Sequence, residues 1–190
     1  QGAAVSKVII EKVLHEFGSI PGVTEDVSDI LLNLKQVRLR LHSGDFDLMR
    51  LEAKGPGEIT AEHFECGENI TILNPEQHIA TLNQDGKISM DTTVAMNKGY
   101  VPAERNKEEK DPVGSIPLDS THSPITRVNY AVTNARVGQQ TDYDRLTMEV
   151  WTDGSVQPTD ALAFAAKIMK EQLQFFINFE EVPEPVIEEV

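Results

Sequence analysis

The stretch from Pro158 to Phe179 constrains this chain most, because it has the pattern of a long helix with more apolar surface than one small domain needs. Pro158 and Asp160 are typical of a helix start: proline fixes the backbone angle, and a carboxylate is favourable near the positive end of a helix. At 1.5 Å per residue, such a helix would be roughly 30 Å long. It is too long and too apolar to be an ordinary surface helix.

One side of this predicted helix is an apolar stripe, because its apolar side chains recur at steps of three and four residues. If part of the helix packs against a second chain, six residues of the stripe would form that dimer interface: Leu162, Ala165, Ile168, Met169, Leu173 and Phe176. Phe164, Phe175, Ile177 and Phe179 lie off the stripe. Two interpretations follow: the helix is enclosed by its own domain, or part of it packs against a second chain.

The charge balance excludes some function classes. The 190 residues include 17 Lys and Arg and 31 Asp and Glu, which leaves a formal charge of −14, so we expect no direct DNA binding by this portion. The single cysteine, Cys66, rules out an internal disulfide. No apolar run approaches the roughly 20 residues of a membrane span, so we expect no membrane partner.

The first half of the chain has the pattern of a β-rich domain with one helix. Apolar residues alternate roughly with polar ones from Val5 to Phe17, which predicts a strand. Thr24 is a candidate cap for a short helix that ends near Lys35. Residues 37–41 and 46–53 alternate on either side of a turn, which predicts a hairpin.

The second half contains a long irregular stretch, a pair of strands and the long helix. From residue 100 to 124 the periodicity fades, and four prolines and the charged run at residues 104–111 predict a solvated loop. Residues 126–137 and 146–151 are predicted strands. Residues 181–190 are acidic and contain proline, as is typical of a linker.

The search for catalytic chemistry finds one weak candidate. Asp142 and Asp144 lie one residue apart at a strand start, so their carboxylates share a face and could hold Mg²⁺ for phosphoryl transfer. An ordinary acidic turn is the alternative, since a third carboxylate and a phosphate-binding loop are missing from the pattern. A metal-dependent phosphoryl-transfer enzyme and a stand-alone β-rich binding module therefore remain as alternative functions.

Four segments, taken together, resemble the N-terminal domain of the alpha subunit of bacterial and plastid DNA-directed RNA polymerase. They occur in that family's order and at similar spacing, and they are VLHEFGSIPGVTEDVSDILLNLK from Val13, MNKGYVPAERN from Met96, SPITRVNYAVTNARVGQQTDYDRLTMEVWTDGS from Ser123, and EQLQFF from Glu171.

The resemblance implies an α+β fold of two subdomains. Residues 2–125 would form a mostly antiparallel, β-rich inserted subdomain that docks the beta and beta-prime subunits. Residues 126–180 would form the rest of a dimerisation subdomain with the long C-terminal helix, and residues 181–190 an acidic linker. Members of the family carry a strand and a first dimerisation helix ahead of the position of Gln1, and a DNA-binding domain beyond the linker, so we expect this chain to be one part of such a subunit.

The resemblance also implies that this chain is a non-catalytic subunit of an enzyme complex. Two alpha chains form a homodimer and nucleate the assembly of beta and beta-prime, which hold the Mg²⁺ and perform the nucleotidyl transfer in the cytoplasm of a bacterium or in a plastid. This chain would carry no catalytic residue, no cofactor and no metal. The residues that would dock beta and beta-prime are Glu16, Glu25, Asp26, Asn33, Lys35, Arg136, Gln140 and Asp142.

Overall fold

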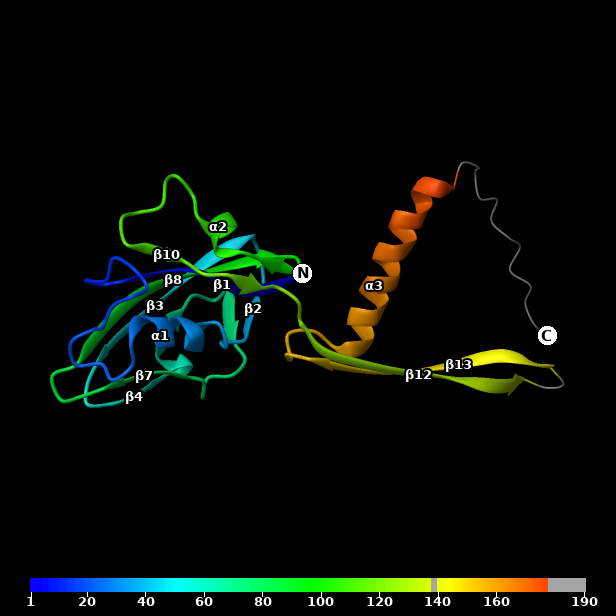
Figure 1. Cartoon of the computed structure of the whole chain (residues 1–190), viewed down its shortest axis with the longest axis horizontal. Helices are drawn as coiled ribbons and strands as arrows, with labels where there is room; N and C mark the ends of the chain where they lie inside the picture. Colours follow the sequence, from blue (N-terminus) through cyan, green and yellow to red (C-terminus); the bar gives the residue numbers. More distant parts are fainter. Residues whose placement is uncertain (138–139, 178–190) are drawn as a thin grey trace. The chain divides into compact units, whose positions relative to one another are not determined.

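The structure, a computed structural model, describes residues 1–137 and 140–177; of residues 135–142 no side chain is described. It forms two compact units, residues 1–155 and 156–190. The first unit contains all the strands and two short helices, and the second contains α3 (Pro158–Leu173) and the 3-10 turn η2 (Gln174–Phe176) (Figure 1). The α+β architecture predicted from the sequence is confirmed. The predicted domain boundaries at residues 125 and 180 stay predictions.

A seven-stranded antiparallel sheet is the centre of the first unit. Its strands lie in the order β5-β3-β8-β1-β2-β6, with β10 added to β1. They are β1 (Gly2–Ile10), β2 (Leu39–Leu41), β3 (Phe46–Lys54), β5 (Phe64–Cys66), β6 (Ile70–Ile72), β8 (Lys87–Asn97) and β10 (Ser115–Pro117). The other elements of this part are α1 (Val27–Leu34), β4 (Gly57–Thr60), η1 (Ala61–His63), β7 (His78–Leu82), β9 (Tyr100–Val101), α2 (Ala103–Asn106) and β11 (Ser120–Thr121).

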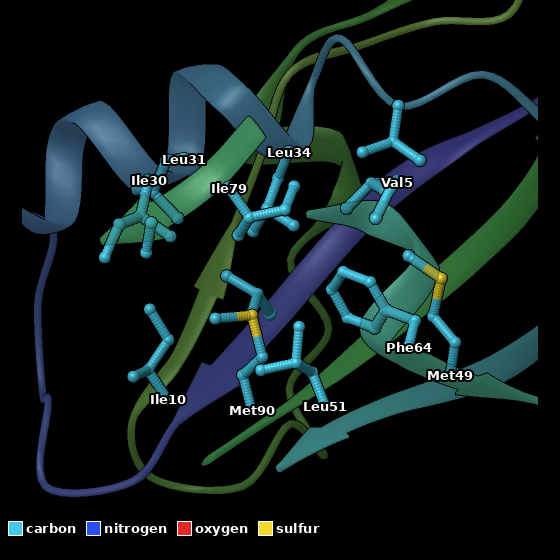
Figure 2. Close-up of a cluster of buried hydrophobic side chains, with 14 of the residues drawn as sticks. Val5, Ile10, Ile30, Leu31, Leu34, Met49, Leu51, Phe64, Ile79 and Met90 are labelled. Atoms are coloured by element: carbon cyan, nitrogen blue, oxygen red, sulfur yellow. The ribbon is translucent and has the colours of Figure 1, made fainter. Parts of the chain in front are cut away.

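The core lies between one face of this sheet and a layer formed by α1 and β7. Strand side chains alternate between the two faces of a sheet, so every second residue of β3 and β8 points into this layer. Ile30 and Leu34 of α1 and Ile79 of β7 are fully buried against them (Figure 2). The helical spacing of its apolar residues therefore fixes which side of α1 faces the sheet.

Three local predictions for the first half are wrong. The N-terminal strand ends at Ile10 rather than Phe17, because the chain turns at Glu11 and Lys12, where Lys12 adopts a positive φ of 67°. Helix α1 begins at Val27, and neither Thr24 nor the N-cap residue Asp26 caps it with a side-chain hydrogen bond.

The predicted hairpin of residues 37–41 and 46–53 does not form. Strand β2 pairs with β1 and β6, whereas β3 pairs with β8 and β5. Two strands that are neighbours in the sequence are thus separated in the sheet by β8 and β1.

The stretch from residue 100 to 124 contains more regular secondary structure than the sequence predicts. It contains β9, α2, β10 and β11. Its charged run is not wholly solvated, because Lys7 of β1 donates hydrogen bonds to Glu108 (2.9 Å) and Asp111 (2.7 Å). These hydrogen bonds raise the pKa of Lys7 against the opposing effect of burial, and the bond from Lys7 lowers the pKa of Asp111.

A buried histidine joins the first and last segments of this sheet region. His122 Nδ1 donates to the carbonyl oxygen of Gly2 (3.0 Å), and Ser120 Oγ donates to His122 Nε2 (2.8 Å). Asn106 of α2 in turn donates to Ser120 Oγ (3.1 Å). Burial lowers the pKa of His122, although the hydrogen bond to Gly2 opposes the shift. The ring is therefore held neutral, with its proton on Nδ1.

The loop ahead of α1 is held along β7 by main-chain hydrogen bonds. Asn83 N donates to Gly22 O (2.9 Å), and Thr24 N donates to Thr81 O (3.0 Å). Gly22 and Gly86 approach so closely that a Cβ on Gly86 would lie 2.3 Å from Gly22 O. The position of this loop thus depends on contacts with residues about sixty positions further along the chain.

The last three elements occur in the predicted order, but β13 (Gln140–Thr152) begins at Gln140, six residues before the predicted strand start at Leu146. Strands β12 (Ile125–Val137) and β13 form a long antiparallel hairpin, and α3 begins at Pro158, as predicted. The helix is shorter than predicted, since it ends at Leu173 and continues as the 3-10 turn to Phe176. Phe179 and the predicted linker at residues 181–190 lie outside the described residues.

Gly86→Ala should destabilise the first unit by about 1–3 kcal/mol, because the added methyl group would overlap the main chain at Gly22. Urea unfolding followed by circular dichroism measures the change. Gly67→Ala is the matched control: its Cβ would meet no atom within 4 Å, so its unfolding curve should be close to wild type. Equal curves for the two variants would contradict the close approach.

The free energy of unfolding should fall as the pH drops below the ordinary histidine pKa of 6.5 toward the lowered pKa of His122. The unfolded chain takes up a proton in this range, whereas the buried ring resists protonation. Urea unfolding at several pH values measures the effect. His122→Gln should reduce the pH dependence, while the exposed His42→Gln should leave it unchanged. An unaltered dependence in His122→Gln would show that the ring is not held neutral.

Candidate assembly surfaces

The first candidate surface comprises the loop from Leu14 to Asp26 and the outer face of α1. Leu14, Phe17 and Leu32 are large apolar side chains that are 72%, 80% and 54% exposed. Glu16 and Asp26 are exposed beside them in sequence. The surface therefore combines apolar side chains with carboxylates, a composition that suits a protein partner.

Glu25 belongs to this loop, but its carboxylate is turned toward β7. Its Oε2 accepts a hydrogen bond from Thr81 N (2.6 Å), and its Oε1 accepts from Thr81 Oγ1 (2.9 Å) and contacts His78 Nε2 (2.9 Å). Burial alone would raise the pKa of Glu25, but the hydrogen bonds from Thr81 and His78 lower it. Glu25 is therefore ionised, and both of its carboxylate oxygens have hydrogen-bond partners within the chain.

Two more of the predicted docking residues have partners inside the chain. Asn33 Nδ2 donates to Ile79 O (3.0 Å), which ties α1 to β7. Lys35 forms an ion pair with Asp119, and the hydrogen bond from Lys35 lowers the pKa of Asp119. Of the predicted set, Glu16 and Asp26 thus remain exposed on this loop. Arg136, Gln140 and Asp142 belong to the hairpin, where the structure describes none of their side chains.

Sequence reasoning missed the apolar members of this surface. Leu14 and Phe17 were included in a predicted strand, which would have placed one face of that strand against a core. Both lie beyond the end of β1 and are exposed. The sequence gives no signal for the end of β1 at Ile10, because residues 11–17 contain no Gly, Pro, Asn or Asp.

The second candidate surface is α3, none of whose residues is buried in this chain. The predicted interface residues Leu162, Ile168 and Met169 are 51%, 55% and 65% exposed, and Leu173 and Phe176 are 57% and 85% exposed. Ala165 is exposed between them. Phe164 and Phe175 are 60% and 84% exposed on another side of the helix. Five of the six predicted residues thus lie along α3 and Phe176 lies in the 3-10 turn that follows, and within their own compact unit none of them is buried.

The hairpin carries a third apolar surface that sequence reasoning did not single out. Val128 pairs with Val150, Tyr130 with Met148 and Val132 with Leu146, so these six side chains share one face of the two strands. Tyr130, Val132 and Leu146 are 69%, 56% and 59% exposed. On the other face, Arg127 lies over the Trp151 ring, 4.6 Å from its centroid. A two-stranded hairpin with an exposed apolar face requires a covering partner to be stable.

The weak candidate for a metal site, Asp142 and Asp144, lies in β13. Among the described residues, no three His, Cys, Asp or Glu side chains are grouped so that they could hold a metal ion. Asp144 pairs with Asn134 in the hairpin, and the side chain of Asp142 is not described. Burial, and then the charge of Asp47, raise the pKa of the Cys66 thiol, which lowers its reactivity. Within the described part of the chain, no helix is long and apolar enough to cross a membrane.

Comparison with known proteins identifies the family to which the chain belongs. The family model for the RNA polymerase Rpb3/RpoA insert domain matches residues 8–123. The DNA-directed RNA polymerase subunit alpha of Pelobacter propionicus is 59% identical over 185 residues, which are 97% of this chain and 54% of that protein. The subunits alpha of Geobacter metallireducens and Desulfosudis oleivorans are 56% and 54% identical, over 99% and 97% of this chain and 55% of each protein.

The chain spans about half the length of the curated relatives it matches. The resemblance carried by the four segments is confirmed, whereas neither alternative function gains support. The chain therefore belongs to the family of RNA polymerase alpha subunits and contains the insert domain of that family at residues 8–123.

Proposed function

We propose that this chain is the assembly scaffold of a bacterial DNA-directed RNA polymerase, acting in the cytoplasm. As part of an alpha subunit it pairs with a second copy of itself and docks the beta and beta-prime subunits, which carry out the nucleotidyl transfer. The observation that supports this most strongly is the uncovered apolar face of α3 in a chain of this family.

The exposed apolar side chains of α3 favour a second copy of this chain as the partner. Burial of apolar surface contributes about 25 cal/mol per Å², so a helix that exposes five large apolar side chains on one face gains substantially from being covered. A second α3 offers a face of the same shape and chemistry, and a two-fold dimer joins identical patches. The predicted dimerisation subdomain, residues 126–180, contains both α3 and the apolar face of the hairpin.

We propose that the loop from Leu14 to Asp26 and the outer face of α1 dock the large subunits. Leu14, Phe17 and Leu32 supply apolar contacts, and Glu16 and Asp26 supply charge at the edge of the contact. Interfaces commonly combine an apolar centre with a polar rim. Arg136, Gln140 and Asp142 are kept as proposed docking residues on the hairpin.

The charge of the chain supports a scaffold without direct DNA contact. A net charge of −14 repels a phosphate backbone, so sequence-independent DNA binding by this part is unfavourable.

Phe176→Glu should weaken dimerisation of the full-length alpha subunit at least about a hundredfold, because it places an unpaired carboxylate in an apolar contact. Sedimentation equilibrium measures the dissociation constant. Circular dichroism should show that the β-rich part stays folded, since Phe176 lies in the other compact unit.

Ala163→Glu is the matched control, because helical spacing puts residue 163 on the side of α3 away from the apolar stripe. This variant should dimerise like the wild type. A dimer of unchanged affinity in Phe176→Glu, or equal weakening in both variants, would show that the stripe is not the interface.

A further inference from the structure

We infer that Glu25, His78, Thr81 and Glu58 form a positioning cluster that holds the docking loop in the arrangement required by the large subunits. The inference rests on the proposed docking function of residues 14–26. It changes the role of Glu25, which the sequence predicts as a contact residue. In the positioning cluster Glu25 acts on the partner only through the loop that it holds.

The geometry of Glu25 favours positioning over contact. Its carboxylate takes Thr81 N and Thr81 Oγ1 as donors and contacts His78 Nε2, at 2.6, 2.9 and 2.9 Å. Both oxygens are thereby used within the chain. The bond from Thr81 N continues the main-chain hydrogen bonds between the loop and β7, in which Thr24 N donates to Thr81 O (3.0 Å). The side chain of Glu25 thus adds to the main-chain hydrogen bonds that hold the loop against β7.

His78 connects this loop to a second strand. Its Nε2 lies 2.9 Å from Glu25 Oε1 and its Nδ1 lies 2.9 Å from Glu58 Oε1 of β4. A carboxylate can only accept hydrogen bonds, so the ring donates to both partners only when both nitrogens carry hydrogen. That form is the imidazolium cation. Glu25 from the loop and Glu58 from β4 are the titratable groups in contact with it.

The position of the loop should therefore depend on pH. Burial disfavours the charged ring, but the hydrogen bonds to Glu25 and Glu58 and their charges outweigh burial and raise the pKa of His78 above 6.5. The cluster is complete below this raised pKa and loses a donor as the pH rises through it. At the acid end the Glu25 carboxylate stays ionised below the usual range of a glutamate, because its hydrogen bonds from Thr81 and His78 lower its pKa. A loosened loop must be ordered again on docking, which reduces affinity.

The test uses the full-length alpha subunit and measures its affinity for beta and for beta-prime from about pH 6 to about pH 9. The wild type should lose about tenfold in affinity for the subunit that the loop docks as His78 loses its proton. His78→Gln keeps a side-chain hydrogen bond but cannot be a cation. It should bind about tenfold more weakly at low pH, and the step seen in the wild type should disappear.

Hydrogen exchange of the loop amides separates this inference from the docking proposal. In His78→Gln, the amides of Thr24 and Val27 should exchange at least about tenfold faster than in the wild type at low pH, after correction for intrinsic rates. The exposed His42→Gln should match the wild type in exchange and in affinity. Unchanged exchange in His78→Gln would overturn the positioning cluster whatever the binding data show.

The two binding outcomes differ in meaning. A wild type that binds neither large subunit at any pH would refute the docking proposal, and with it the role of the cluster in docking. A wild type that binds, together with a His78→Gln variant of the same affinity and pH profile, would refute the positioning role alone.

Discussion

The packing of α1 and β7 against the seven-stranded sheet is the interaction on which the rest of the first unit depends. Ile30, Leu34 and Ile79 are completely buried there, opposite Leu51 and Met90 of the sheet (Figure 2). This contact places β7 beside the loop ahead of α1, so the same burial that stabilises the fold also creates the main-chain and side-chain bonds that hold the loop. Core packing and the candidate docking surface are thus physically coupled.

The large apolar residues of the chain fall into two groups, one buried in a core and the other exposed. In residues 1–124 they close a core within residues 5–118, and apart from Tyr100 and Val113 the large exposed ones lie on the loop, on α1 and on β3. In α3 no residue is buried, and the hairpin exposes an apolar face. An arrangement with so much uncovered apolar surface is characteristic of a component of an assembly, in which other chains complete the burial.

The sequence predicts some features of this structure well, because their signals are local. The start of α3 follows from Pro158 and the turn residues before it, and the apolar stripe on α3 follows from spacing alone. The wrong hairpin has a physical reason: residues 37–41 and 46–53 alternate correctly, but alternation does not say which strand pairs with which. The role of Glu25 could not be predicted, since its partners His78 and Thr81 lie more than fifty positions away and are brought close only by the pairing of β7 with the loop.

The link between Gly2 and His122 means that the two ends of the sheet region leave it side by side, although 120 positions separate them. Because these ends meet, residues 2–122 act on the neighbouring segments like a short turn. The length of this region therefore adds little to the conformational entropy that those segments lose on folding. Such a module can lengthen or shorten at its far tips over evolutionary time while its two ends stay together.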